Sequence, residues 1–239
     1  MPTVQLPADM PSRMKQLPRD EVGRPIPFFA AEVDGHHDFR VMEPESLFLA
    51  IRDQLCWVCG SRLGRVRNTS APRGVFVAGP MCLINRTSAE PPSHADCAEW
   101  SAKACPFLAK PAKERRQGHM PETAEMPGIG IMRNPGVTAL ISSNQWSTWD
   151  PGEIAGQHGV LFSFSRIDSV HWMTEGHRAS VSEVMDSIES GIPVLAEMAE
   201  SEQGAMVHLA RKTRDALRWV GTFDIAQYPN VAAVLRHLL

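Results

Sequence analysis

The sequence predicts an α+β protein with a metal-binding N-terminal half, a small antiparallel sheet and a helical C-terminal half. Two observations predict this class. Cys56 and Cys59 form a CxxC pair, and His94 and Cys97 form an HxxC pair further along the chain. Together they supply the four ligands of a closed metal site. Elsewhere, short apolar segments bounded by turn residues indicate strands, and longer segments after residue 180 have the apolar period of helices.

Six short segments are predicted as strands because they are apolar or rich in β-branched and aromatic residues. Asp34 and Gly35 give a turn signal between the first two, which are therefore expected to pair as a hairpin. Residues 62–73 are expected to form a hairpin arm ahead of the third strand. The predicted strands are residues 28–33, 39–42, 75–78, 137–141, 160–164 and 169–173.

The helices are predicted from their start and stop signals. Pro44 suits the first turn of a helix, Ser93 is expected to be an N-cap, and Ser180 opens a capping box. Gly191 and Pro193 are expected to break the helix that begins at Ser180. The predicted helices are residues 44–55, 93–105, 180–189, 195–199, 205–220 and 231–239.

The composition along the chain predicts four segments. The first 18 residues contain no apolar core segment, so they are expected to be a flexible arm and not a secretory signal. A stretch rich in proline, glycine and methionine is expected to be a linker or a surface loop. The segments are the arm (1–18), a strand–helix unit with the metal module (19–108), the linker or loop (109–136), and antiparallel strands with covering helices (137–239).

Bulk composition excludes several protein classes. The chain has 239 residues, of which 43% are hydrophobic and 21% charged, as in an ordinary globular protein. No segment reaches the roughly 18 apolar residues of a transmembrane helix, so no membrane contact is expected. Five cysteines are an odd number, and without an export signal they predict reduced thiols around a metal and not a disulfide framework. The expected compartment is the cytoplasm.

Zn²⁺ is the expected cofactor, bound by Cys56, Cys59, His94 and Cys97. Cys82 could replace His94 as the fourth ligand and give an all-cysteine site. His94 is favoured because it lies three residues before Cys97, which places both side chains on one side of a helical turn. Four protein ligands leave no open position for water, so the expected role of the metal is structural.

The order of these parts resembles a treble-clef zinc module over about residues 55–107. Such modules have a CxxC knuckle, then a hairpin, then a helix whose first turn carries the last two ligands. Gly60 would allow the tight turn of the knuckle. The insertion between knuckle and helix is long compared with that pattern, and it contains Cys82. The resemblance implies a structural zinc ion.

Positive charge is concentrated around the expected metal site, although the whole chain has a net charge of -3. Residues 60–116 contain ten basic and four acidic side chains. This excess predicts a basic face that binds an anion or a nucleic acid, with a solvated basic surface as the alternative. The candidate contacts are Arg62, Arg65, Arg67, Arg86, Lys113, Arg115 and Arg116.

A polar loop precedes His94 and could line a pocket beside the metal. Its candidate residues are Asn85, Arg86, Ser88 and Glu90. Arg86 could hold a phosphate or carboxylate group with two parallel hydrogen bonds. The alternative is a capping loop whose side chains satisfy backbone groups around the knuckle.

The leading functional hypothesis is a structural-zinc adaptor that docks nucleic acid or a protein through the basic face of residues 60–116. The first alternative is an enzyme, either a metal-dependent hydrolase or nuclease, or one that holds a small anionic substrate in the loop of residues 85–90. An HNH nuclease would need a histidine base between Cys59 and His94, where the chain has none. A zinc deaminase would need an HxE motif that is also missing.

Several longer segments resemble bacterial and prophage-type proteins. These segments are CWVCG, GPMC, INRTSAEPPSH and EGHRASVSEV. The resemblance implies a bacterial or phage setting and no particular activity. It gives a third hypothesis, a phage or mobile-element protein that acts on a host protein.

Overall fold

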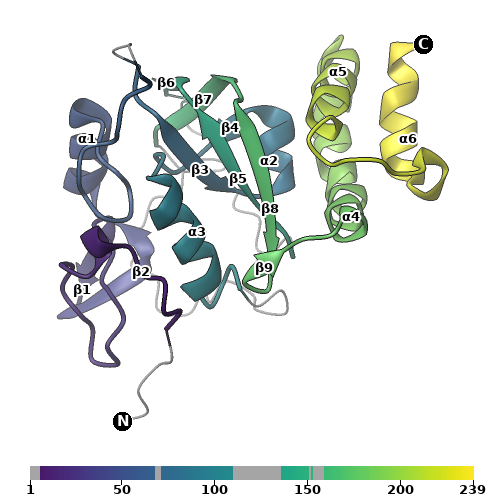
Figure 1. Ribbon diagram of the computed structural model, residues 1–239. Helices are drawn as coiled ribbons and strands as arrows, with labels where there is room; N and C mark the ends of the chain where they lie inside the picture. Colours follow the sequence, from purple (N-terminus) through teal and green to yellow (C-terminus); the bar gives the residue numbers. More distant parts are fainter. Residues whose placement is uncertain (1–5, 68–70, 110–135, 151, 153–158) are drawn as a thin grey trace.

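The computed structural model describes residues 6–67, 71–109, 136–150, 152 and 159–239. Strands occupy the centre of the molecule (Figure 1). The N-terminal hairpin, α1 (Pro44–Asp53) and α3 (Ala95–Ala104) lie on one side of them. The helices α4 (Val181–Glu200), α5 (Ala205–Leu217) and α6 (Pro229–Leu235) lie on the other. In the described part of the chain, no helix combines the length and apolar character needed to cross a membrane.

The N-terminal hairpin forms as the sequence predicts. β1 (Ala30–Val33) pairs antiparallel with β2 (His36–Met42). Asp34 and Gly35 both have positive φ, of 51° and 77°, which is the two-residue turn geometry that suits the twist of a hairpin. α1 (Pro44–Asp53) follows with its proline in the first turn.

Two antiparallel sheets form the centre. The four-stranded sheet has the order β3-β5-β8-β9, and the three-stranded sheet has the order β4-β7-β6. A hydrogen bond of 2.5 Å joins the two sheets. The hydroxyl of Ser143, at the end of β5, donates it to the carbonyl of Arg166, at the end of β7. The strands are β3 (Gly74–Ala78), β4 (Thr87–Ser88), β5 (Thr138–Ser143), β6 (Gln145–Trp149), β7 (Leu161–Arg166), β8 (Ser169–Thr174) and β9 (His177–Arg178).

Both faces of the larger sheet are covered. Successive residues along its strands point to opposite faces and are buried in two different cores. Phe76, Ile141 and Trp172 belong to the main core, which they form with the C-terminal helices. Val75 and Leu140, their neighbours in sequence, belong to a smaller core with alanines of α3. A sheet with two buried faces places the N-terminal module and the C-terminal helices on opposite sides of one scaffold.

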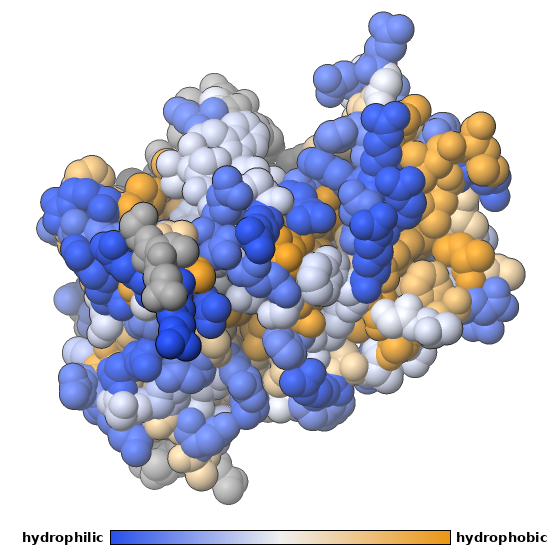
Figure 2. Space-filling model, turned by 45° about the horizontal axis from the view of Figure 1, so that its top comes forward, coloured by the Kyte–Doolittle hydropathy of each residue, from blue (hydrophilic) through white to orange (hydrophobic). Residues whose placement is uncertain are grey.

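The C-terminal half is largely helical, and apolar surface gathers at this end of the molecule (Figure 2). Ser180 and Glu183 form the predicted capping box at the start of α4. The 3₁₀ turn Ile225–Gln227 precedes the last α-helix, and the 3₁₀ turn Arg236–Leu238 follows it. The helices that pack in the main core are α2 (Pro80–Asn85), α4 (Val181–Glu200), α5 (Ala205–Leu217) and α6 (Pro229–Leu235).

The predicted break in α4 is wrong. The helix continues through Gly191 and Pro193, and the short helix predicted after the break is its last part. Ile188 and Ile192 are 1% and 0% exposed in the main core, so packing stabilises the helix just before the break signal and within it. A Cβ at Gly191 would lie 3.1 Å from the sulfur of Met81, which shows how closely α2 approaches here.

Residues 6–18 are packed on the metal module, where the sequence predicts a flexible arm. They contain the 3₁₀ turn Ser12–Met14, and Met14 is only 2% exposed. The indole N–H of Trp100 donates to the carbonyl of Pro7 at 3.2 Å, and Lys103 pairs with Asp9 at 2.7 Å. This packing depends on α3, a distant part of the chain. The predicted linker lies outside the described residues, except for residues 109 and 136.

Candidate metal centre

The first two candidate ligands lie on a tight turn. The N–H of Gly60 donates to the carbonyl of Cys56 at 2.9 Å, and the N–H of Cys56 donates to the carbonyl of Ser61 at 2.8 Å. Gly60 has a φ of +70°, and a Cβ there would come within 2.8 Å of the Phe28 ring. Glycine is therefore required for both its backbone angle and its size.

The second pair lies at the start of α3 (Ala95–Ala104). The sequence predicts Ser93 as the N-cap, but the N-cap is His94. Ser93 is held in an extended conformation, because its N–H and its carbonyl both pair with Val75, each at 2.8 Å. The helix therefore starts one residue later, and Cys97 lies in its first turn.

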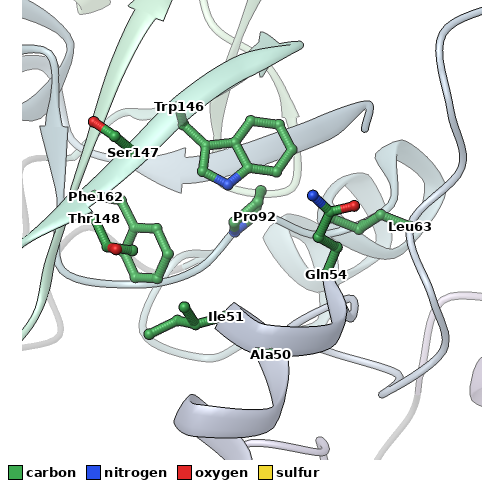
Figure 3. A pocket seen from close by; sticks show the side chains of 9 residues that line it. All are labelled: Ala50, Ile51, Gln54, Leu63, Pro92, Trp146, Ser147, Thr148 and Phe162. Carbon is green, nitrogen blue, oxygen red and sulfur yellow. The ribbon is translucent and has the colours of Figure 1, made fainter. Parts of the chain in front are cut away.

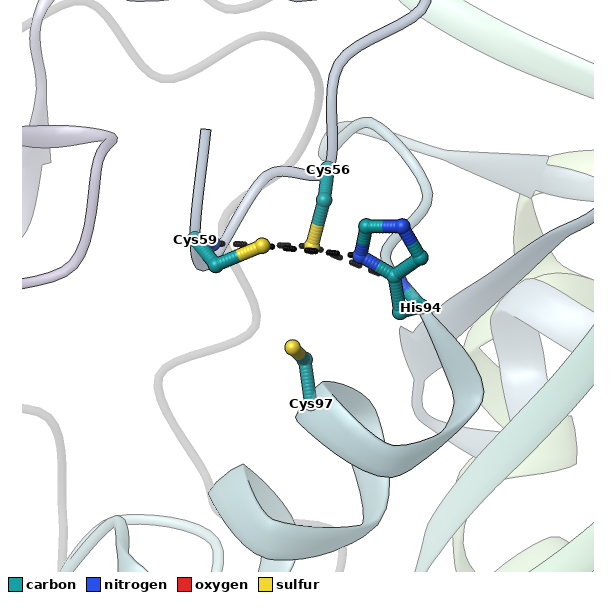
Figure 4. A group of neighbouring side chains, drawn as sticks. All are labelled: Cys56, Cys59, His94 and Cys97. Carbon is teal, nitrogen blue, oxygen red and sulfur yellow. Dashed lines mark hydrogen bonds between the residues drawn. The ribbon is translucent and has the colours of Figure 1, made fainter. Parts of the chain in front are cut away.

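The four candidate ligand atoms converge (Figure 4). The Sγ atoms of the three cysteines and a ring nitrogen of His94 all lie within 4.8 Å of one another. The backbone N–H of His94 also donates to Cys56 Sγ at 3.3 Å. A tetrahedral zinc ion with bonds of about 2.3 Å to sulfur needs sulfur atoms roughly 3.8 Å apart, so a small contraction of this cluster would enclose the ion. The structure thus brings together Cys56, Cys59, His94 and Cys97, with a donor set that fits a metal and is typical of zinc.

The imidazole of His94 is oriented by a backbone group. Its Nε2 lies 3.1 Å from the carbonyl of Arg62, which can only accept, so Nε2 carries the proton. In the neutral imidazole, which is the form that binds a metal, Nδ1 then has the free lone pair, and this atom lies 3.5 Å from Cys59 Sγ. A second hydrogen bond of this kind fixes the tautomer of a metal-binding histidine.

Cys59, His94 and Cys97 have strongly shifted pKa values. Hydrogen bonds with Cys56 and Cys97 lower the pKa of the Cys59 thiol well below its usual range. Hydrogen bonds to Cys56 and Cys59 raise the pKa of Cys97 far above that range, and hydrogen bonds to the same two thiols raise the pKa of His94 to about 10. The cluster therefore favours a thiolate beside an imidazolium, and a metal ion would have to displace protons from it.

The cluster is enclosed by apolar side chains. Cys56 and Cys97 are both 0% exposed. The surrounding residues are Met14, Val58, Leu63 and Trp100, with Leu6, Met10 and Leu17 packed against them. Water is excluded from most of the cluster, as expected for a structural metal site that stabilises the fold.

The other cysteines lie outside the cluster. Cys82 is half-buried on α2, and burial raises the pKa of its thiol. Cys105 is the C-cap of α3, and burial raises its thiol pKa as well. The geometry therefore pairs His94, and not Cys82, with the other three thiols.

The structure separates the described candidates of the basic face into two places. Arg62, Arg65 and Arg67 are exposed on the segment that follows the knuckle. Arg86 is the C-cap of α2 and lies beside residues of β7 and α5. The remaining candidates, Lys113, Arg115 and Arg116, lie outside the described residues.

The polar loop candidates form local hydrogen bonds. The Ser88 hydroxyl donates to the carbonyl of Glu90 at 2.9 Å and accepts from the Glu90 N–H at 3.1 Å. The carbonyl of Asn85 accepts from Lys212 Nζ at 3.0 Å. Arg86 lines a cavity with residues of other elements. The Ser88 hydroxyl thus satisfies backbone groups within the loop itself.

A cavity of about 190 Å³ lies between α1, the metal module and the strands β6 and β7 (Figure 3). The indole of Trp146 borders it opposite Ile51, and Gln54 and Thr148 contribute polar groups. These residues come from distant parts of the chain, so no local sequence pattern could have indicated the cavity. None of its lining residues is an acid, a base or a metal ligand, and it adds no reactive group to the centre.

Comparison with known proteins gives no relative. No protein-family model, no curated protein and no solved structure matches the chain. The predicted bacterial or prophage resemblance receives no support from these comparisons.

Proposed function

We propose that this protein is a non-enzymatic adaptor in which a structural zinc ion supports a nucleic-acid-binding hairpin. The hairpin consists of the described residues 62–67 and 71–73, which pair antiparallel, and we call it the arginine hairpin. The observation that carries the proposal is the 3.1 Å hydrogen bond between His94 Nε2 and the carbonyl of Arg62. It joins a metal ligand directly to the first arginine of this segment.

A structural role for the ion is supported by the number and burial of its ligands. Four protein side chains fill a tetrahedral coordination shell, which leaves no position for a reactive water. The knuckle, the hairpin and the first turn of α3 follow one another in the order of a treble-clef module, which we propose as the architecture of this site. The arginine hairpin would be the hairpin of that module.

The arginine hairpin has the backbone support to present its side chains. The N–H of Arg73 donates to the carbonyl of Gly64 at 2.8 Å, and the N–H of Val66 donates to the carbonyl of Ala71 at 2.9 Å. Arg65, Arg67 and Arg73 are exposed, and none forms an ion pair with another described residue.

Several other cations of the N-terminal module are paired with acids. Lys103 pairs with Asp9 and Glu99, at 2.7 and 3.1 Å, and Arg13 pairs with Asp96 at 3.3 Å. Lys15 and Arg19 also have no ion-pair partner among the described residues, but the arginine hairpin brings Arg65, Arg67 and Arg73 together in one short segment. Phosphate contacts from such arginines are the main source of affinity for nucleic acids.

The test is binding of a fluorescent 20-nucleotide DNA, single- and double-stranded, to the zinc-loaded chain. The triple variant Arg65→Gln, Arg67→Gln and Arg73→Gln is compared with a charge-matched control, Arg178→Gln, Arg211→Gln and Arg236→Gln. We expect the hairpin variant to bind more weakly. The slope of the logarithm of its binding constant against the logarithm of salt concentration should fall in magnitude by about one for each phosphate that is no longer neutralised. Equal binding by both variants, or binding that is insensitive to salt, would reject the proposal.

A protein partner is the second candidate, supported by the apolar surface of the C-terminal helices. Val194 and Met198 on α4 are 48% and 51% exposed. Replacing both with serine should leave DNA binding unchanged but weaken any protein complex that uses this surface. The comparison would be made by cross-linking the full chain and the variant in the same lysate.

A further inference from the structure

A second positively charged site is lined by residues that are not among the candidate metal ligands. A cavity of about 370 Å³ opens between the C-cap of α2, the turn from β7 to β8, and the end of α5. We call it the cationic cleft. The lining residues used below are Arg86, Ser165, Arg166, Asp215, Arg218 and Trp219.

Arg86 is fixed at the base of this cleft. It has a φ of 61°, and its N–H donates to the carbonyl of Leu83 at 3.3 Å. Its carbonyl accepts from the N–H of Phe164 at 3.1 Å, so both sides of its backbone are held. The guanidinium is half-buried and has no hydrogen bond or ion pair with any other described residue. Burial lowers its pKa, and the charge of Asp215 opposes that change only in part.

A second half-buried cation lies beside Arg86. Lys212 Nζ donates to the carbonyl of Asn85 at 3.0 Å and has no carboxylate partner in the described chain. Burial lowers the pKa of Lys212, and the neighbouring charge of Arg86 lowers it further. Two like charges in partial burial destabilise each other unless an anion lies between or beside them.

The acids of the cleft do not balance its cations. Asp215 lies 3.7 Å from both Arg214 and Arg218, and Asp168 lies 3.3 Å from Arg166. Each carboxylate therefore already has an arginine partner. Among the residues that line the cleft, the three arginines Arg86, Arg166 and Arg218 outnumber the single acid Asp215, which gives the cleft an excess of about two positive charges, and Lys212 adds positive charge beside Arg86. A phosphate monoester carries about -1.5 to -2 charges near neutral pH, whereas a carboxylate carries only one.

We propose that the cationic cleft binds a small phosphate monoester, with Arg86 as its central contact. A guanidinium can form two parallel hydrogen bonds to a phosphate. Arg166 and Arg218 are exposed at the rim and can close on the same group. Trp219 borders the cleft, and its partly exposed indole offers a face for a planar group attached to the phosphate. This site is independent of the arginine hairpin and of the zinc ion.

The test is isothermal titration of the zinc-loaded full chain with inorganic phosphate and with AMP. We expect one saturable site for each, tighter for AMP because the adenine can stack on Trp219. Arg86→Gln should weaken binding about tenfold or more, which is the effect of losing a charged hydrogen-bond partner. Arg218→Gln removes a rim charge and should weaken it less.

The matched control is Arg178→Gln. Arg178 pairs with Met173 at the end of β8 remote from the cleft, so this change removes the same charge elsewhere and should leave affinity within about twofold. Thermal melting without ligand checks the folding of each variant. No saturable binding by the original chain, or equal affinity of Arg86→Gln, Arg218→Gln and the original chain, would overturn the proposal. Loss of binding in the triple hairpin variant would show that phosphate binds at the arginine hairpin instead.

Discussion

The backbone carbonyl of Glu189 accepts a hydrogen bond from Nδ2 of Asn230, at 3.3 Å. Pro193 has no N–H with which to close the helical bond to this carbonyl, so Asn230 supplies the donor from the start of α6. The Glu189 carboxylate in turn accepts from the N–H groups of Asn230 and Val231, at 2.7 and 2.9 Å. Glu189 therefore caps α6 while Asn230 compensates for the proline in α4.

Replacement of Asn230 tests this relationship. Asn230→Ala should lower the free energy of unfolding by about 1 kcal/mol, because the carbonyl of Glu189 loses its donor. The same change should cost less in a Pro193→Ala background, where alanine restores the helical N–H. Urea denaturation of the four proteins measures the coupling between the two sites. The same cost in both backgrounds would show that Asn230 does not act as the replacement donor.

Metal content tests the ligand set. The purified chain should contain one zinc ion, and His94→Ala or Cys97→Ser should lose it together with the packing of the N-terminal module. The loss is large because a structural zinc ion contributes on the order of 10 kcal/mol to folding. Cys82→Ser is the matched control, since it changes a thiol outside the cluster and should retain zinc. Elemental analysis and near-ultraviolet circular dichroism give the two measurements, and loss of zinc from Cys82→Ser alone would contradict the geometry.

Zinc affinity should depend on pH. The raised pKa of His94, about 10, means that its proton stabilises the metal-free fold fully below its unfolded pKa of 6.5, and this contribution is lost as pH rises through the folded value. Zinc needs the neutral imidazole and the thiolates, so its binding must displace these protons and strengthens as pH rises. Competition with a chelator at about pH 6, 7 and 8 should show a steadily falling Kd. A Kd that does not change over this range would argue against a thiolate–imidazole site.

Two glycines of the N-terminal module provide a matched pair of substitutions. Gly60→Ala places a Cβ 2.8 Å from Phe28 at a φ of +70°, whereas Gly64→Ala meets nothing within 4 Å and has no positive φ. The first should destabilise the zinc-loaded chain by roughly 1–3 kcal/mol, and the second should change stability by less than about 0.5 kcal/mol. Thermal melts of both variants with zinc provide the comparison. Equal melting temperatures would mean that the knuckle tolerates a side chain at Gly60.

The parts of the fold that could be predicted from sequence are those with local causes. The turn at Asp34 and Gly35 and the capping box at Ser180 each depend on a few consecutive residues. The four candidate ligands could be chosen for the same reason, because a CxxC pair and an HxxC pair each occupy one turn. Their convergence then requires only that the two turns meet.

The parts that sequence could not predict depend on distant partners. Pro193 signals a break, but Asn230 satisfies the carbonyl that it leaves free. The N-terminal segment has no apolar run of its own, yet Met14 is buried beside Trp100. The charge excess of the cationic cleft arises from three elements that meet only in the folded chain.

The hydrogen bond between His94 and the carbonyl of Arg62 makes the arginine hairpin part of the coordination shell's outer layer. Loss of the ion would free the imidazole and with it the anchor of the hairpin. Metal and nucleic acid would then be thermodynamically linked ligands, each raising the affinity of the chain for the other by the same factor. Under zinc limitation the chain would lose the packing of its N-terminal module and, in the proposed function, its affinity for nucleic acid together, and so it would report the supply of the metal.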